Sequence, residues 1–303
     1  MVYPVQVVSI SSLKGGVGKT SVTLGLASAA LDAGLKTLVV DLDPHADAST
    51  GLGINPTGRE PIGLMLKNVR RSNLNANAVP SSWTERHQEI VRSVKESAAR
   101  SQNDDAAQDP ADAAASDNSS SDNSSEAFSE GRLDVAYGSA FTGIYDRPDL
   151  RLRDLKRLKT VLSRVTGYDL VLIDCPPSLN GLTRMAWYAS DKVLLVAETS
   201  LFSVAGTERT MRALNMFRRE FAPSIQTAGV VANKYRPESG EHQFRLKEMA
   251  TMFGDALLSP VLPDIPDWQQ IQGAAHAVHQ WPTESARLSA VLLSELLDAV
   301  RNK

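Results

Sequence analysis

The sequence contains a single cysteine and few aromatic residues, and it carries no strong net charge. Because Cys175 is the only cysteine among 303 residues, a disulfide framework and a Cys-x-x-Cys metal or iron–sulfur site are both excluded. We interpret Cys175 as a small core residue. The formal net charge of −3 means that any surface for an anionic partner must be local.

Long hydrophobic runs are also missing, since none approaches the roughly 20 residues that a membrane-spanning helix needs. Residues 1–4 lead directly into an apolar run, without the basic region and cleavage site of a secretory signal. Hydrophobic residues nevertheless make up 42% of the chain, which is enough for a sizeable core in one or two domains. We therefore expect a soluble, cytoplasmic protein.

The stretch at residues 12–20 carries the clearest chemical signal. It lies between an apolar run at 5–10, which predicts a buried strand, and residues 21–31, which predict a helix. Its glycines allow successive backbone N–H groups to converge on phosphate oxygens, and the helix N-terminus adds partial positive charge. In such a loop we expect Lys19 to reach the β- and γ-phosphates and Thr20 to bind Mg²⁺.

This loop departs from the usual G-x-x-x-x-G-K-[ST] spacing. Leu13 stands where the first glycine belongs, and a second lysine, Lys14, follows it. In this respect the sequence resembles the deviant Walker A ATPases, K-G-G-x-G-K-[ST], the group that contains the ParA and MinD partition proteins. The resemblance implies an ATP-sandwich dimer in which Lys14 crosses the interface to the partner's ATP. It also implies that ATP is contacted by Lys14, Gly15, Gly16, Val17, Gly18, Lys19, Thr20 and Ser21.

A second motif of this family follows at residues 41–49, which resemble D-x-D-P-Q-x-N-A-[ST]. The resemblance implies that Asp43 orients or activates the attacking water, a role that suits phosphoryl transfer because that chemistry mainly requires positioning. His45 and Asp47 replace the usual glutamine and asparagine. We interpret His45 as an ordinary loop residue, and Asp47 either as a loop residue or as a Mg²⁺ ligand through water.

A third motif at residues 168–178 resembles the family's D-x-P-P form of a Walker B element. This resemblance implies that Asp174 holds Mg²⁺ through water, so that Thr20, Asp43 and Asp174 form the metal site and Lys14 and Asp43 are the catalytic residues. In several relatives an asparagine at the end of a later strand hydrogen-bonds the adenine amine. Asn233 is therefore our candidate contact to the base, and Asp264 is a second one.

Residues 72–130 interrupt the family pattern, and we expect them to be a disordered insertion. Residues 103–130 include eight acidic side chains and no lysine or arginine, which gives this segment a net charge of −8. A segment of this composition cannot bury enough apolar surface to offset the entropy of ordering. Only residues 80–95 show a helical pattern. We interpret the insertion as a solvated spacer, with a regulatory tail as the alternative.

The predicted fold is α/β, a single ParA-like ATPase domain over 1–303 with a mostly parallel twisted sheet and helices on both faces. It is the P-loop NTPase fold of the deviant Walker A type, with nucleotide at the carboxyl ends of the strands. Further helices are predicted at 150–165, 203–221, 269–277 and 285–301.

A local excess of positive charge occurs in residues 209–247, where eight basic and three acidic residues give a net charge of +5. In partition ATPases this region carries the non-specific DNA surface, and phosphate contacts of that kind depend strongly on salt. The alternative interpretation is a solvated face. The candidate DNA contacts are Arg209, Arg212, Arg218, Arg219, Arg236, Arg245 and Lys247.

The resemblance implies a slow ATPase that uses ATP and Mg²⁺, forms a homodimer on ATP binding and binds DNA non-specifically on the nucleoid. It would segregate plasmid or chromosomal DNA with a ParB-like stimulatory partner. The alternatives are a MinD-like or cargo-positioning ATPase on a membrane or protein surface, and a regulatory partner that barely hydrolyses ATP. The last helix contains Glu295 and Asp298 and lacks aromatic residues, so we expect no stable membrane anchor. The chain starts at its first strand, so we also expect no helix-turn-helix that reads an operator.

Overall fold

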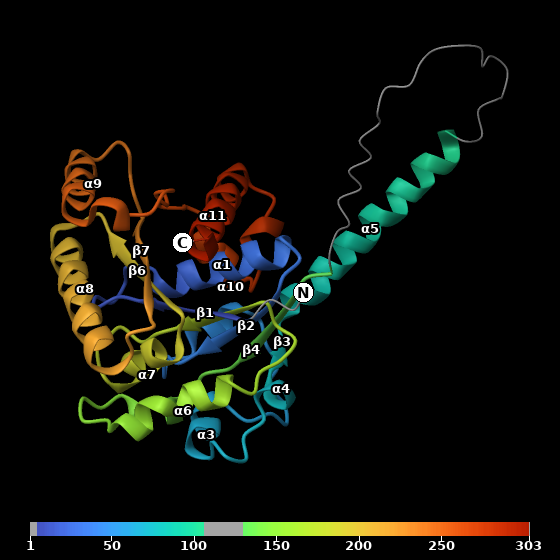
Figure 1. Cartoon of the computed structure of the whole chain (residues 1–303). Helices are drawn as coiled ribbons and strands as arrows, with labels where there is room; N and C mark the ends of the chain where they lie inside the picture. Colours follow the sequence, from blue (N-terminus) through green and yellow to red (C-terminus); the bar gives the residue numbers. More distant parts are fainter. Residues whose placement is uncertain (1–4, 106–129, 303) are drawn as a thin grey trace, which may run out of the picture.

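The apolar runs that precede each sequence motif become central strands of a seven-stranded sheet (Figure 1). The computed structural model describes residues 5–105 and 130–302. The strands are β1 (Gln6–Ser11), β2 (Lys36–Asp41), β3 (Val79–Pro80), β4 (Arg132–Ala136), β5 (Leu170–Asp174), β6 (Lys192–Glu198) and β7 (Gln226–Asn233). They lie in the order β3-β4-β2-β5-β1-β6-β7, and all pairings are parallel except that of the short β3 with β4.

Helices cover both faces of this sheet (Figure 1). One face packs against α1 (Lys19–Asp32), α10 (Trp268–Gly273) and α11 (Glu284–Asn302), and the other against α6 (Leu152–Leu162), α7 (Gly181–Ala189) and α8 (Leu201–Phe221). The remaining helices are α2 (Asp47–Gly51), α3 (Ile62–Lys67), α4 (Leu74–Asn77), α5 (Ser82–Asp105) and α9 (Gly240–Phe253), and the 3₁₀ turns are η1 (Ala140–Tyr145), η2 (Gly254–Ala256) and η3 (Val278–Gln280). The predicted single α/β domain with a mostly parallel sheet is confirmed.

Neighbouring residues of each strand point into two different cores, because successive side chains of a strand face opposite sides of the sheet. Val40 and Ile173 lie in the core under α6 and α7, whereas Val39 and Leu172 lie in the core under α1 and α11. The register pairs Asp41 with Asp174 at the ends of β2 and β5. The carboxyl edge of the sheet therefore brings together side chains that are 133 positions apart.

The prediction of a disordered insertion over 72–130 is wrong for residues 74–105, which form α4, β3 and α5. Apolar burial orders the start of α5, because Trp83 is 2% exposed and Val91 is 6% exposed. The Trp83 indole also donates to the carbonyl of Ala275 at 2.8 Å, and the Thr84 hydroxyl donates to the carbonyl of Leu133 at 3.1 Å. Beyond these contacts, α5 projects away from the sheet (Figure 1). The rest of the proposed insertion, 106–129, lies outside the described residues.

The predicted helices at 150–165, 203–221 and 285–301 correspond to α6, α8 and α11, whereas the one at 269–277 is shorter and ends at Gly273. On α11, Leu288 and Val291 are exposed at 61% and 57%, so not all of its large apolar residues face the sheet. Its buried face is instead completed by small residues, including Ala286 and Ala290, which permit close packing. Within the two described ranges, no helix is both long and apolar enough to cross a bilayer.

Candidate phosphate-binding site

The glycine-rich loop connects the end of β1 to the start of α1 at the carboxyl edge of the sheet. Gly16 and Gly18 have φ angles of +79° and +90°, in the left-handed region that residues with side chains rarely adopt. A Cβ at Gly18 would also collide with the amide nitrogen of Asn233. Val17, between the two glycines, is fully buried and fixes the loop to the core. The loop conformation therefore depends on glycine at these two positions.

The first turn of α1 lies against the end of β5. The hydroxyls of Thr20 and Thr23 each donate to a carboxylate oxygen of Asp174 at 2.8 Å. Burial raises the pKa of Asp174, and the neighbouring carboxylate of Asp41 raises it further. Burial lowers the pKa of the Lys19 ammonium, and the attraction of Asp174 opposes that shift. The edge thus holds a buried cation next to a hydrogen-bonded carboxylate.

Asp41 fixes the loop that carries Asp43. One oxygen of Asp41 accepts the backbone N–H of Asp43 at 3.1 Å, and the other accepts the N–H and the hydroxyl of Ser49 at 2.8 and 2.6 Å. The Ser49 hydroxyl also accepts the N–H of Gly138 at 3.0 Å. Asp43 is 8% exposed and accepts the N–H of His45 at 3.0 Å. The motifs predicted a role for Asp43 but none for Asp41, Ser49 or Gly138. The signal for Asp41 is a carboxylate at the end of a buried strand.

A cavity of about 530 Å³ opens between these elements. Its wall contains backbone N–H groups of a helix N-terminus, a buried ammonium and carboxylates, which is the arrangement that binds phosphate together with a cation. The residues on this wall include Gly15, Gly16, Gly18, Lys19, Thr20, Ser21, Asp43, His45, Asp47 and Lys234. His45 and Asp47 therefore lie on the cavity wall, where the sequence alone did not distinguish them from ordinary loop residues.

Lys14 lies beside this cavity, and its ammonium group contacts Glu198 and Ser200 outside the cavity. Its Nζ is 3.1 Å from a carboxylate oxygen of Glu198 and donates to the Ser200 hydroxyl at 3.4 Å. The Lys14 side chain is 39% exposed, and that of Glu198 is 27% exposed. The two lysines of the loop therefore have different environments, and Glu198 is a contact that the motifs did not reveal.

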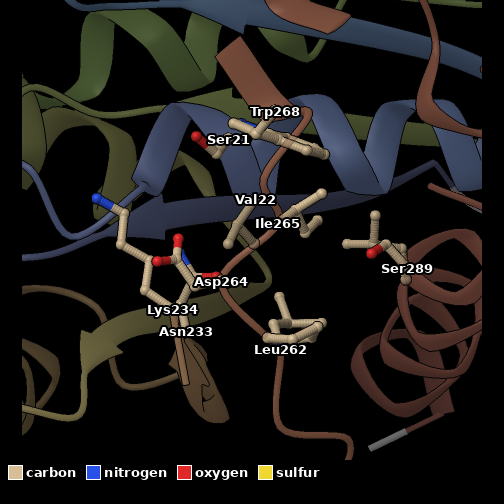
Figure 2. Close-up of a pocket in the computed structure, with 11 residues that line it drawn as sticks. Ser21, Val22, Asn233, Lys234, Leu262, Asp264, Ile265, Trp268 and Ser289 are labelled. Atoms are coloured by element: carbon tan, nitrogen blue, oxygen red, sulfur yellow. The ribbon is translucent and has the colours of Figure 1, made fainter. Parts of the chain in front are cut away.

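A second, largely apolar cavity adjoins the loop (Figure 2). Figure 2 shows the indole of Trp268 on one side of it and the side chains of Asn233 and Lys234 on another. The Asn233 amide donates to the carbonyl of Val17 at 2.8 Å, and the Lys234 ammonium donates to the carbonyl of Gly16 at 2.7 Å. The end of β7 is therefore bonded to the glycine-rich loop, next to an apolar cavity of about 50 Å³.

The other base-contact candidate, Asp264, lines the same cavity but is already paired. One of its carboxylate oxygens accepts Nε and Nη2 of Arg236 at 2.8 and 2.6 Å. Arg236 was a candidate DNA contact. Asp264, a predicted base contact, and Arg236, a predicted DNA contact, therefore form one ion pair. The sequence did not predict this pair, since the two residues are 28 positions apart.

The remaining DNA candidates lie on α8 and α9 and differ in how free their charges are. Arg209, Arg219 and Lys247 are exposed. Arg212 pairs with Glu208, and Arg245 is held by both Glu241 and Glu248 with only 15% of its side chain exposed. Arg218 is half-buried. Two of the pairing carboxylates, Glu208 and Glu248, fall just outside residues 209–247, so that range overstated the local positive charge.

Comparison with known families decides the wider assignment. The CobQ/CobB/MinD/ParA nucleotide binding domain matches residues 8–273, which include all three motifs and the candidate base contacts. The chain belongs to this family. The predicted relationship to the ParA- and MinD-type ATPases is therefore confirmed, and the chain carries a nucleotide-binding domain of their kind.

Individual relatives agree with this membership of the CobQ/CobB/MinD/ParA family. The chromosome partitioning protein ParA of Caulobacter vibrioides is 29% identical over 261 residues, which cover 86% of this chain and 81% of the relative. Cobyrinic acid a,c-diamide synthase of Mycobacterium smegmatis, solved with ADP and magnesium, has a TM-score of 0.68 at 19% identity and 97% and 93% coverage. A putative plasmid partition protein of Borrelia burgdorferi, solved with AMPPNP, has a TM-score of 0.66 at 18% identity and 99% coverage of both chains.

The residues at the carboxyl edge suit Mg²⁺ as well as nucleotide. Mg²⁺ prefers oxygen ligands and keeps several waters, and the hydroxyl of Thr20 and the carboxylate of Asp174 supply such oxygens next to Asp43. Asp174 is a buried carboxylate that a cation would compensate. In the part of the chain that the structure describes, no three His, Cys, Asp or Glu side chains form a closed metal cluster. An ion would therefore be held jointly by these oxygens, by water and by the nucleotide.

Proposed function

We propose that this chain is a ParA-like ATPase that alternates between an ATP-bound dimer and a free state. The observation that carries the proposal is the different placement of the two loop lysines. Lys19 is buried on the wall of the 530 Å³ cavity, here called the phosphate cavity, and Lys14 lies outside it. Lys19 is 7% exposed and is available to the β- and γ-phosphates of the chain's own ATP. Lys14 is bound to Glu198 at the surface, from which it can move to the ATP of a second copy.

The surface around Lys14 favours a second copy as its partner. Leu201 and Phe202, which follow shortly after Glu198, are 49% and 75% exposed. Exposed apolar side chains next to a functional site usually mark an interaction surface. A second copy that covers them would also bring its own phosphate cavity to Lys14. ATP would stabilise the dimer because it makes contacts with both protomers that it cannot make with one.

In the proposed reaction Asp43 positions the attacking water. Its backbone N–H is held by Asp41, and its carboxylate lies on the wall of the phosphate cavity. Lys19 and Lys14 would stabilise the charge that develops on the phosphate oxygens, which is the main requirement of phosphoryl transfer. Mg²⁺, held by Thr20 and Asp174, would neutralise phosphate charge when bound. Because the partner's Lys14 reaches the phosphates only in the dimer, the monomer would lack this second cation and would hydrolyse ATP slowly.

We further propose that the ATP-bound dimer binds DNA without sequence preference and serves the partition of plasmid or chromosomal DNA on the nucleoid. The support is the 29% identity to a chromosome partitioning protein over 86% of this chain. A ParB-like protein would stimulate hydrolysis and release the dimer from DNA. The alternative, a MinD-like or cargo-positioning ATPase on a membrane or protein surface, is compatible with the same family and with the fold shared with McdA and MinD structures.

Retention on random-sequence duplex DNA tests this function. The protein is applied with ATP, with ADP and without nucleotide across a salt series, and Lys19→Ala serves as a control that should not respond to ATP. Binding with ATP alone that weakens as salt rises supports the DNA switch. No binding in any nucleotide state, with the ATP dimer verified in parallel, would contradict it and favour a membrane or protein surface.

A further inference from the structure

A basic groove lies outside the nucleotide site, between the end of α3 and helix α6. It has a volume of about 580 Å³, and the side chains along it include Lys67, Arg70, Arg71, Arg153, Arg157 and Thr160. Figure 1 shows α3 and α6 side by side, away from α9 and α11. We name this feature the α3–α6 groove. It is separate from α8 and α9, which carry most of the DNA candidates of the sequence analysis.

The frame of this groove is fixed by hydrogen bonds from its own arginines. Nη1 of Arg157 donates to the carbonyl of Leu66 at 2.9 Å, and Nη1 of Arg164 donates to the carbonyl of Val69 at 2.9 Å. The loop after α3 is closed by a bond from the Arg71 N–H to the carbonyl of Asn68 at 2.8 Å. The two walls are therefore held at a set separation, which lowers the ordering cost of binding a ligand.

The charge of the α3–α6 groove is almost entirely positive. Among the described residues, Asp154 is the one carboxylate paired with the arginines of the groove. Its oxygens lie 2.9 Å from Nε of Arg157 and 3.9 Å from Nε of Arg153, whose side chain is 73% exposed. Arg70 and Arg71 are exposed as well. On α8 and α9, by contrast, Arg212 and Arg245 are paired with glutamates of their own helices. Arg209 and Arg219 are also exposed on α8, so what distinguishes the groove is that Arg70, Arg71 and Arg153 line one cavity.

We infer that the α3–α6 groove binds the sugar–phosphate backbone of DNA, an inference that rests on the DNA binding in the proposed function. A guanidinium group matches a phosphate in two parallel hydrogen bonds. Arg153 and Thr160 are about 10 Å apart along α6 at 1.5 Å per residue, so the groove is long enough to contact more than one phosphate of a strand. The lining contains one apolar residue, Val69, so it lacks the apolar anchors on which protein partners usually depend.

Charge substitutions in full-length protein test this inference. The triple variant Arg70→Gln/Arg71→Gln/Arg153→Gln changes exposed side chains and leaves the frame residues Arg157 and Arg164 intact. With ATP, we expect its affinity for a random-sequence duplex to fall at least tenfold at low salt. The slope of log affinity against log salt should decrease by about 3, since each lost phosphate contact removes about 0.9. Replacing the same three arginines by lysine keeps their charge and should retain most of the slope.

A matched triple variant on α8 and α9, Arg209→Gln/Arg219→Gln/Lys247→Gln, removes the same charge elsewhere and should change the slope less. The inference is overturned if the groove variant, folded and dimeric with ATP, binds DNA as wild type does; DNA binding by the wild type would then still support the proposed function. Wild-type protein that fails to bind DNA in any state overturns both. A competition experiment with polyglutamate gives a further test. The inference is also overturned if polyglutamate displaces the labelled duplex as effectively as unlabelled DNA of equal charge does, because the groove would then accept any acidic polypeptide.

Discussion

Lys14 and Lys19 are five positions apart, and their surroundings differ, as the different roles proposed for them require. The Lys19 ammonium is buried next to Asp174, and burial lowers its pKa. A bound phosphate would stabilise the charged form of Lys19. The Lys14 ammonium is at the surface on Glu198. The motif spacing was enough to predict that both lysines matter. It could not predict Glu198, because β6 reaches the loop only through the fold, 184 positions later.

Replacing each lysine by alanine should separate nucleotide binding from dimerisation. Lys19→Ala should weaken the affinity for Mg·ATP by about 10- to 150-fold, since charge-assisted hydrogen bonds contribute roughly 1.5–3 kcal/mol. Lys14→Ala should retain the affinity within about threefold, because its side chain faces away from the chain's own phosphate cavity. Titration calorimetry of the two variants against wild type measures the difference. Equal losses of Mg·ATP affinity in the two variants would contradict the separate roles of Lys14 and Lys19.

Breaking the ion pair of Lys14 should favour the dimer. Glu198→Gln removes the charge that holds Lys14 on its own chain, and exposed pairs of this kind contribute about 0.2–1 kcal/mol. Because two such pairs break in each dimer, we expect the ATP-dependent dimerisation constant to rise roughly 2- to 30-fold, as measured by sedimentation equilibrium. Glu208→Gln, which breaks the exposed pair with Arg212, is the control and should leave it unchanged. A weaker dimer in Glu198→Gln would mean that Glu198 itself belongs to the interface.

Elements of the structure are joined by contacts that the sequence shows only in part. The strands and helices of the three motifs were predictable because long apolar runs and periodic helices leave a clear signal. The helical pattern at 80–95 corresponds to α5, but the ordered extent of α5 was not predicted because its composition is polar and its start is ordered by the burial of Trp83 and Val91. Ser49 and Gly138 were missed because their link to Asp41 is a hydrogen-bond chain across 89 positions.

The start of α7 depends on a glycine at a close backbone approach. A Cβ at Gly181 would collide with the carbonyl oxygen of Tyr145 and lie 2.7 Å from that of Arg147. Gly181→Ala should therefore destabilise the fold by about 1–3 kcal/mol, as overpacking does. Gly206→Ala is the control, because nothing lies within 4 Å of a Cβ there, and in the middle of α8 it should stabilise by roughly 0.5–1 kcal/mol. Urea unfolding of both variants measures the change in the free energy of unfolding. Similar changes in the two variants would contradict the prediction.

His279 in η3 joins α1 to α11 and should make stability depend on pH. Its Nδ1 lies 2.7 Å from the Ser28 hydroxyl and its Nε2 lies 3.1 Å from that of Ser294. Burial lowers the pKa of His279 from its ordinary 6.5, while Asp32 opposes the shift. The unfolded chain therefore binds this proton at a higher pH than the folded one, so stability falls as pH decreases through 6.5 towards the lower folded pKa.

Urea midpoints of wild type and His279→Gln between neutral pH and about pH 5 test this dependence. The variant should be less stable at neutral pH, and the difference between the two proteins should shrink as the solution becomes more acidic. Other carboxylates and histidines titrate in both proteins, so the difference isolates His279. A difference that stays constant with pH would show that the imidazole does not gain its proton on unfolding in this range.

The whole molecule combines a phosphate cavity at the carboxyl edge of the sheet with charged surfaces on its outer helices. The fold and the glycine-rich loop beside the cavity at the carboxyl edge followed from motifs, because the same short stretches determine the strand, the loop and the helix. The distribution of free charge did not follow, because a count along residues 209–247 cannot show which arginines pair with neighbouring glutamates. In the proposed cycle, ATP joins two such molecules, each of which carries an α3–α6 groove for DNA.

The central claim, that ATP joins two copies of this chain, is tested by sedimentation velocity with ATP, with ADP and without nucleotide. Asp43→Ala is measured beside wild type, because a chain that cannot position the attacking water should keep its ATP. We predict a dimer with ATP in both proteins, more persistent in Asp43→Ala, and a monomer with ADP or without nucleotide. Lys14→Ala should stay monomeric with ATP bound. A wild-type monomer that is saturated with ATP, or the same dimer in all three states, would contradict the account.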